Sequence, residues 1–139
     1  MPEVRQERTY WRDDRLSQRH RRWGWNCPAT DIDFLMLEYD NGKASAIVEY
    51  KNEHAAKQYA SHPTYQAIKD LGDRANVPVL ACRYSDDFGK WVAVPLNDKA
   101  REYLPERKEM DEAEWVKLLY KMRGREVSSE VLDSMKIEI

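Results

Sequence analysis

The sequence contains few cysteines and no long apolar run, the features that are typical of disulfide-bonded secreted proteins and of membrane proteins. The 139 residues include only two cysteines, Cys27 and Cys82, whose separation fits no metal-binding spacing, so both are expected to be reduced thiols. No run of about 18 apolar residues is present, and no transmembrane helix is predicted. The N-terminus is polar and rich in arginine, without the apolar core of a secretory signal. We therefore expect a cytoplasmic protein with no membrane partner.

Glycine and net charge are low as well. The five glycines are scattered singly, so the sequence contains no glycine-rich phosphate loop and gives no indication of ATP dependence. A formal net charge of −2 argues against a general nucleic-acid binder. Arginines nevertheless gather within residues 1–22, whereas acidic residues gather around 106–114. This asymmetry predicts one basic face on a nearly neutral protein.

The succession of polar, apolar and turn-forming segments predicts an α/β (α+β) fold. A chain of this length makes one domain, 1–139, in which 106–139 is expected to be a C-terminal helical extension. Helices should flank a mixed central sheet of about four strands, in the order α-β-β-α-β-β-α. The strands are expected at 30–39, 44–51, 77–84 and 91–96, and the helices at 3–20, 53–59, 61–75, after the capping box of Asp111 and Glu114, and from 128.

Charged residues stand at the ends of the first two predicted strands. Asp33 precedes a nearly continuous apolar run, and Glu49 and Lys51 close the returning strand. An ionisable side chain in a strand is unfavourable unless something compensates its charge. Mg²⁺ prefers carboxylate oxygens, and a lysine beside it would orient water and stabilise negative charge on a phosphate. The alternative is structural: Asp33 caps a turn, and Glu49 and Lys51 form an ion pair.

The register of the hairpin provides a test of the metal-site interpretation. Side chains alternate between the two faces of a strand, so Glu49 and Lys51 share one face. A two-residue loop, 41–42, would pair Asp33 with Tyr50 and direct it to the other face. A three-residue loop, 40–42, with Gly42 in the left-handed conformation would place Asp33 opposite Glu49. We predict the three-residue loop, and we expect Tyr50 to point to the opposite, packed face.

Two motifs and the order of the elements resemble the PD-(D/E)xK nuclease superfamily over about residues 5–96. The motifs read Pro28-Ala29-Thr30-Asp31-Ile32-Asp33 and Glu49-Tyr50-Lys51. The likeness is to compact Holliday-junction-resolvase-like nucleases and to phage or prokaryotic nucleases. It implies a restriction-endonuclease-like core and a location in a prokaryotic cell or a phage-infected host. It also implies hydrolysis of DNA phosphodiester bonds that depends on Mg²⁺, with Mn²⁺ as a substitute. An endonuclease is favoured over an exonuclease, although the residues do not decide between the two.

The resemblance also assigns roles to individual residues. It implies that Asp33 and Glu49 bind the metal and that Lys51 serves the attacking water. Asp31 shares a face with Asp33 and is the alternative ligand, although the apolar run that starts directly after Asp33 favours the latter. Members of the superfamily often carry an acidic residue on the first helix, and Glu7 is the candidate here.

Basic and aromatic residues near these motifs are candidates for nucleic-acid contact. Arginines interleave with an aromatic residue before the first strand, where they could clamp phosphates and stack on a base; a solvated helix end is the alternative. Basic or amide residues after the second motif could reach the scissile phosphate, or form an ordinary exposed helix face. Trp25 is expected in the core. The nucleic-acid-binding candidates are Arg15, Arg19, His20, Arg21, Arg22, Trp23, His54, Lys57 and Gln58.

The functional hypothesis from the sequence is therefore a metal-dependent DNA nuclease, with selectivity for junctions or branched DNA as one option. The alternative is a catalytically inactive nucleic-acid-binding or protein-inhibitor module that retains the nuclease fold. The residues do not distinguish DNA from RNA, or duplex from junction or flap. Cutting both strands of a duplex needs two sites related by a two-fold axis, so a homodimer is compatible with the hypothesis.

Overall fold

The computed structural model describes residues 14–135 and divides the chain into two units, Met1–Asp31 and Ile32–Ile139. In the N-terminal unit, helix α1 spans Asp14–Arg22, and the chain then turns at Gly24 with a φ of +86°. The helix predicted over 3–20 is confirmed from residue 14 and runs two residues further, to Arg22. Its first part lies outside the described residues. No helix of the described part combines the length and the apolar character needed to traverse a bilayer.

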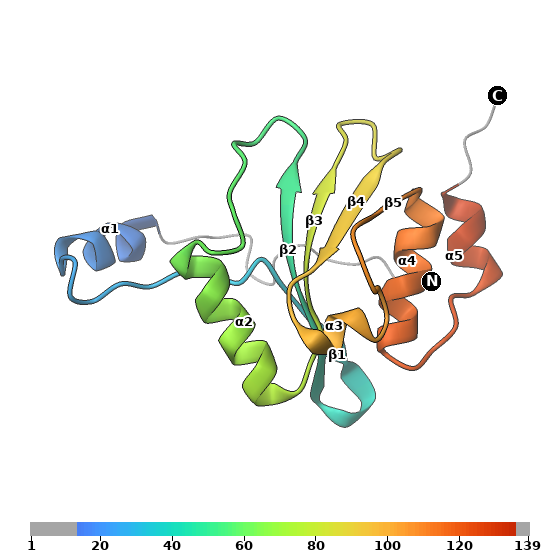
Figure 1. Ribbon diagram of the computed structural model, residues 1–139, viewed down its shortest axis with the longest axis horizontal. Helices are drawn as coiled ribbons and strands as arrows, with labels where there is room; N and C mark the ends of the chain where they lie inside the picture. Colours follow the sequence, from blue (N-terminus) through green and yellow to red (C-terminus); the bar gives the residue numbers. More distant parts are fainter. Residues whose placement is uncertain (1–13, 136–139) are drawn as a thin grey trace. The chain divides into compact units, whose positions relative to one another are not determined.

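The second unit is built on one mixed five-stranded sheet (Figure 1). The predicted α+β class is confirmed, and β5 is a strand that sequence reasoning missed. The parallel pair β2–β3 is joined by helix α2, because parallel neighbours need a long crossover, while all other neighbouring strands are antiparallel. In spatial order the strands are β1 (Phe34–Glu38), β2 (Lys43–Asn52), β3 (Val79–Tyr84), β4 (Trp91–Pro95) and β5 (Lys108–Met110).

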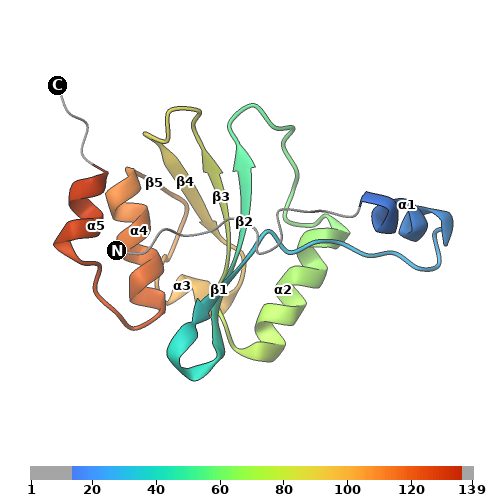
Figure 2. The same cartoon turned by 180° about the vertical axis from the view of Figure 1, so that it is seen from behind.

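Helices cover both faces of the sheet. Helix α2 (Pro63–Ala75) lies on one face and helix α4 (Glu112–Met122) on the other, as Figures 1 and 2 show from opposite sides. Under α2, Ile47 of β2 packs with Ile68; under α4, Val48 of β2 packs with Trp115. Successive residues of β2 therefore alternate between two apolar layers, which assigns every side chain of this strand to a face.

Local signals in the sequence account for the ends of the helices. Asp111 and Glu114 form the predicted capping box of α4. Helix α2, predicted over 61–75, begins at Pro63 and is capped by His62, whose Nδ1 accepts a hydrogen bond from the N–H of Thr64 at 3.2 Å. The remaining helices are the short α3 (Asp98–Arg101), α5 (Ser129–Ser134) and the 3-10 helix η1 (Tyr39–Asn41).

Candidate active site

The loop between β1 and β2 is longer than predicted. Glu38 pairs with Lys43, so the loop holds the four residues 39–42, formed by η1 and a left-handed Gly42 with a φ of +62°. Gly42 thus has the predicted conformation, but the predicted three-residue loop is wrong. The carboxylate of Glu38 accepts a hydrogen bond from the N–H of Asn41 at 2.8 Å and stabilises the longer loop. Continued from this loop, the register would place Asp33 opposite Val48 and on the wrong face.

A β-bulge restores the register that the site requires. The pairing shifts between Met36 and Leu37, which leaves Ser45 of β2 without an opposite residue, and Phe34 then pairs with Val48. The next position along the chain sets Asp33 opposite Glu49. The predicted alignment is therefore reached by an even loop and a one-residue bulge.

Backbone hydrogen bonds join the two carboxylates across the hairpin. The N–H of Asp33 donates to Oε1 of Glu49 at 3.2 Å, and the N–H of Tyr50 donates to Oδ2 of Asp33 at 3.0 Å. Each carboxylate is held by the backbone of the opposite chain segment, which limits its rotamers. The structure thus brings Asp33 and Glu49 together, as the sequence predicted.

The carboxylate of Glu49 carries its charge in an unfavourable environment. Its side chain belongs to the layer under α2, and the residue is only 5% exposed. The pKa of Glu49 is raised from 4.5 to about 7, first by burial and then by the neighbouring Asp33 carboxylate. The hydrogen bond from the N–H of Asp33 and the charge of Lys51 act in the opposite direction. A buried carboxylate beside a second one favours a bound proton or a bound cation.

Lys51 lies on the same face as Glu49, two positions later on β2. It is partly buried and sits beside Arg83, its neighbour in register on β3. Two like charges side by side in a sheet are unfavourable without an anion. The predicted triad of Asp33, Glu49 and Lys51 therefore gathers on one face, at the end of β2. The structural alternative was an ion pair between Glu49 and Lys51. Among the described residues, these two side chains form no ion pair.

Tyr50 fixes the strand from the opposite face. Its hydroxyl accepts a hydrogen bond from Nε1 of Trp115 at 3.1 Å, and its ring meets those of Phe34 and Trp91 edge to face. Burial raises the pKa of Tyr50 to about 12, so the hydroxyl stays protonated. The prediction that Tyr50 packs in the core is confirmed. These aromatic contacts hold Tyr50 in place between Glu49 and Lys51, which stabilises the geometry of the site.

The segment after β2 is not the helix predicted over 53–59. The guanidinium of Arg83 donates three hydrogen bonds from Nη1, to the carbonyl oxygens of Asn52 (3.0 Å), Glu53 (3.2 Å) and Ala55 (2.9 Å). A helix would need these oxygens as acceptors for its own N–H groups. The N–H of His54 donates instead to the side chain of Asn52 at 3.0 Å. A tertiary contact therefore overrides the helical pattern of this segment.

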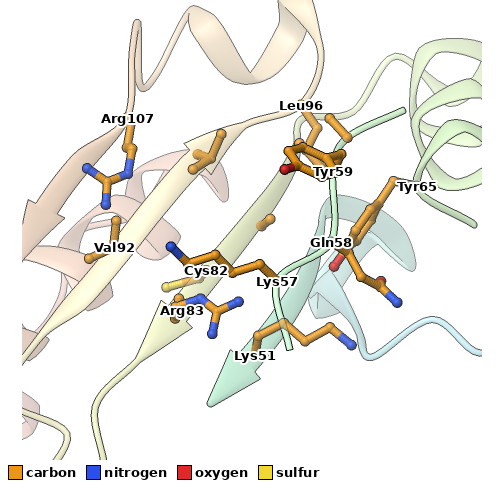
Figure 3. A pocket seen from close by; sticks show the side chains of 13 residues that line it. Lys51, Lys57, Gln58, Tyr59, Tyr65, Cys82, Arg83, Val92, Leu96 and Arg107 are labelled. Carbon is orange, nitrogen blue, oxygen red and sulfur yellow. The ribbon is translucent and has the colours of Figure 1, made fainter. Parts of the chain in front are cut away.

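Two of the three binding candidates on this segment share a cavity with Lys51. Lys57 and Gln58 line a cavity of about 380 Å³ together with Lys51 (Figure 3). Sequence reasoning missed two other basic residues of its wall, Arg83 and Arg107. Arg83 could have been found, because a charged residue within an apolar strand signals a special environment. Arg107 lies between α3 and β5, where no pattern distinguishes it.

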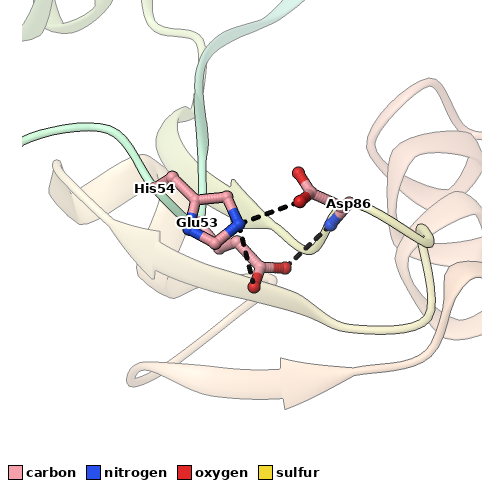
Figure 4. A group of neighbouring side chains, drawn as sticks. All are labelled: Glu53, His54 and Asp86. Carbon is pink, nitrogen blue, oxygen red and sulfur yellow. Dashed lines mark hydrogen bonds and ion pairs between the residues drawn. The ribbon is translucent and has the colours of Figure 1, made fainter.

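His54, the third candidate, lies in a separate polar cluster. Its Nε2 is 2.8 Å from Oδ2 of Asp86 and 3.7 Å from Oε1 of Glu53 (Figure 4). The N–H of Asp86 donates to Oε2 of Glu53 at 2.7 Å. The side chain of Asn52 and then that of His54 hold the pKa of Asp86 below its usual range. These contacts tie the segment after β2 to the turn between β3 and β4, and nucleic-acid contact by His54 stays a prediction.

The remaining candidates belong to the N-terminal unit or lie beyond the described residues. Helix α1 is basic in its last turn, and the rings of His20 and Trp23 lie 4.4 Å apart. Trp25 is 98% exposed, so its predicted place in the core is wrong. Asp31 ends this unit, and Glu7 lies outside the described part, so their roles as ligands stay predictions. The same holds for nucleic-acid contact by Arg15, Arg19, His20, Arg21, Arg22 and Trp23.

Comparison with known proteins adds no relative from which a role could be transferred. No family model, curated protein or solved structure matches this chain. Its function must therefore be inferred from its own side chains.

Proposed function

We propose that this protein is a metal-dependent nuclease that hydrolyses DNA phosphodiester bonds and has a restriction-endonuclease-like core. One observation carries the proposal: Asp33 and Glu49 are joined across β1 and β2, and Lys51 follows on the same face. The crossover from β2 through α2 to a parallel β3 supports the assignment of the core. Both cysteines are free thiols, which supports a cytoplasmic setting.

The chemistry of the two carboxylates suits a hard divalent cation. Each uses one oxygen in the hydrogen bonds described above, Oε1 of Glu49 and Oδ2 of Asp33, and has a second oxygen to offer. A cation would offset both the burial of Glu49 and its repulsion by Asp33, which are two of the causes that raise its pKa. Mg²⁺ usually binds one or two protein carboxylates and leaves room for water and phosphate oxygens. When bound, Mg²⁺ supplies charge that neutralises the phosphate and lowers the pKa of a coordinated water.

The side chains of this site would then act on the substrate as follows. Asp33 and Glu49 hold the cation, and their hydrogen bonds to the backbone keep them in place before the substrate arrives. The ammonium group of Lys51 orients the attacking water and stabilises the negative charge that accumulates on the phosphate oxygens. Water adds to phosphorus as the bond to the leaving oxygen breaks. Arg83, beside Lys51, adds to the positive potential at the phosphate.

Incubation with DNA tests this function directly. We expect the purified chain to cut at least one of linear, circular, single-stranded and four-way-junction DNA when Mn²⁺ or Mg²⁺ is present. Cleavage should stop when EDTA removes the metal, because the carboxylates alone cannot neutralise a phosphate. Gel analysis of end-labelled substrates provides the measurement. Cutting that persists in EDTA, or no cutting of any substrate at any Mn²⁺ concentration, would contradict the proposal.

An inactive nucleic-acid-binding module is the second candidate. It is favoured by the hydrogen bonds of Asp33 and Glu49 to backbone N–H groups, which a purely structural clasp would also make. Such a protein would bind DNA without cutting it and would show no saturable Mn²⁺ binding that depends on Glu49. Calorimetric titration with Mn²⁺ of the wild type and of Glu49→Gln separates the two candidates.

The free edge of the sheet supports the further proposal of a homodimer. Among the described strands, β1 has a neighbour on one side only, and its side chains Phe34, Leu35 and Leu37 are 55%, 48% and 50% exposed. An edge strand whose side chains are mostly apolar tends to pair with another strand. We expect sedimentation to show a dimer that Leu35→Lys dissociates and the apolar control Leu35→Met preserves. A wild-type monomer at all accessible concentrations would contradict this proposal.

A further inference from the structure

The cavity beside Lys51 differs from the rest of the molecule in its charge. The chain as a whole has 25 acidic residues against 23 lysines and arginines, yet none of the described residues that line this cavity is acidic. Four of its lining residues are cations: Lys51, Lys57, Arg83 and Arg107. Such a concentration of one sign of charge in a concave site favours an anionic ligand.

The charges of Lys57, Arg83 and Arg107 are not cancelled by an ion pair within the part of the chain that the structure describes. Arg83 donates to backbone carbonyl oxygens, which are neutral. Lys57 and Arg107 form no ion pair with any described residue. In Figure 3, the side chain of Lys57 extends across the cavity, and Arg107 reaches in from the segment ahead of β5. The cavity therefore presents two cationic groups that an anion could recruit.

The wall of the same cavity is apolar and aromatic. Val92 and Val94 of β4, together with Leu96, form one side. Tyr65 of α2 is only 7% exposed and contributes to the wall, while Tyr59 is 83% exposed and stands at the rim. An exposed tyrosine can stack on a nucleobase, which is a sequence-tolerant contact. The cavity thus combines a surface for a planar ring with cations for a phosphate.

We propose that this cavity binds one unpaired nucleotide, with its base against Tyr59 and the valine wall and its phosphate between Lys57 and Arg107. Its volume of about 380 Å³ is that of a small-molecule site and cannot admit a duplex. A paired nucleotide would have to leave its helix to enter, at the cost of unstacking. An unpaired nucleotide enters without that cost.

The position of the cavity connects it to the proposed catalytic triad. Lys51 lines the cavity and lies on the same face as Glu49, two positions along β2. A nucleotide held here brings the adjoining phosphodiester next to the carboxylates. This consequence rests on the proposed nuclease function, and it names the substrate class: DNA with an unpaired nucleotide beside the scissile bond, such as a single strand or a flap.

Nucleotide binding can be measured without any cleavage. The full chain is titrated in EDTA with 2′-deoxyadenosine 5′-monophosphate, with 2′-deoxyadenosine and with inorganic phosphate. We expect the nucleotide to bind about tenfold more tightly than either fragment, because only it uses both the stacking wall and the cations. If phosphate binds as tightly as the nucleotide, or if none of the three binds, the inference is overturned.

Variants locate the binding site. Arg107→Ala removes an exposed side chain that packs in no core cluster, and Val94→Trp fills the cavity from β4. Both should weaken nucleotide binding about tenfold, whereas Lys117→Ala, an exposed position on α4, should not. Circular dichroism verifies that each variant folds, and Arg107→Ala suffices if Val94→Trp does not. Unchanged affinity in Arg107→Ala would overturn the inference.

Cleavage of matched substrates tests the substrate class separately. With Mn²⁺, the wild type should cut a flap or single strand about tenfold faster than the fully paired duplex of the same sequence, and Arg107→Ala should lose this preference. Nucleotide binding without cleavage of any DNA would refute the nuclease and leave the cavity assignment standing. Cleavage without nucleotide binding or any substrate preference would refute the cavity assignment and leave the nuclease standing.

Discussion

Replacing Lys51 by alanine is expected to slow metal-dependent DNA cleavage by about 100- to 1000-fold while the protein stays folded. A preorganised cation in a partly buried site contributes most to the stabilisation of the transition state, where negative charge on the phosphate is greatest. Lys51 is placed for this role on the same face as the two carboxylates. Single-turnover cleavage of end-labelled DNA with saturating Mn²⁺ measures the change.

The fold of this variant should survive, because Lys51 lies at the end of β2 beside Arg83 and belongs to no core cluster. Removing one of two adjacent like charges relieves repulsion in the sheet. Lys117→Ala, which removes the same charge from the exposed surface of α4, is the matched control and should cut at the wild-type rate. Equal cleavage by the wild type and by Lys51→Ala would show that the activity comes from elsewhere.

Replacing Glu49 by glutamine is expected to remove a pH dependence of stability that the wild type shows in the absence of metal. Folded Glu49 keeps its proton up to a pKa of about 7, whereas the unfolded chain releases it near 4.5. Between these values the folded state binds more protons, so the free energy of unfolding falls as the pH rises. The contribution of Glu49 is fully present below pH 4.5 and lost above pH 7, and it amounts to at most about 3 kcal/mol.

The pH dependence of the free energy of unfolding is compared between the wild type and Glu49→Gln, because other acidic residues change the stability with pH in the opposite direction. The pKa of Asp86, for example, is lowered in the folded state. In urea unfolding with EDTA, Glu49→Gln should match the wild type near pH 4.5 and be more stable than it at pH 8. Glu126→Gln, at an exposed site, is the control. Parallel stability curves for the wild type and Glu49→Gln would contradict the burial of a charged carboxylate here.

Metal should offset most of this difference in stability. A cation that binds only the folded state stabilises it by about 2.7 kcal/mol at a concentration one hundred times the dissociation constant. We therefore expect Mn²⁺ to raise the stability of the wild type at pH 8, where Glu49 is ionised, and to leave Glu49→Gln unchanged. If Mn²⁺ stabilised both proteins equally, the carboxylate of Glu49 would not be a ligand of the metal.

The residues of the candidate site could be predicted from the sequence, but the strand register that brings them together could not. Asp33, Glu49 and Lys51 could be identified because charge at the end of an apolar strand is unusual, and period-two alternation assigns Glu49 and Lys51 to one face. The route that brings Asp33 opposite Glu49 was not predictable. Gly42 indicates a turn but not its length, and the bulge at Ser45 depends on how two strands twist and pack.

The segment after β2 shows where local patterns fail. Residues 53–59 have helical composition, and two of the binding candidates that the helix was expected to carry do line the cavity. Their backbone is nevertheless irregular, because Arg83 takes the carbonyl oxygens that a helix would use. Arg83 is distant in the sequence from this segment, so a prediction from neighbouring residues alone does not include its hydrogen bonds.

The amino-acid order alone determined the class of the fold, the start of α4 and the faces of β2, since each depends on interactions between residues a few positions apart. The three-dimensional fold decided which distant residues meet: the bulged register of Asp33, the burial that raises the pKa of Glu49, and the cavity that joins Lys57 to Arg107. The burial of a side chain, its dielectric environment and its distance from other side chains are properties of the packed sheet and its helices. They arise only when segments far apart in the chain come into contact.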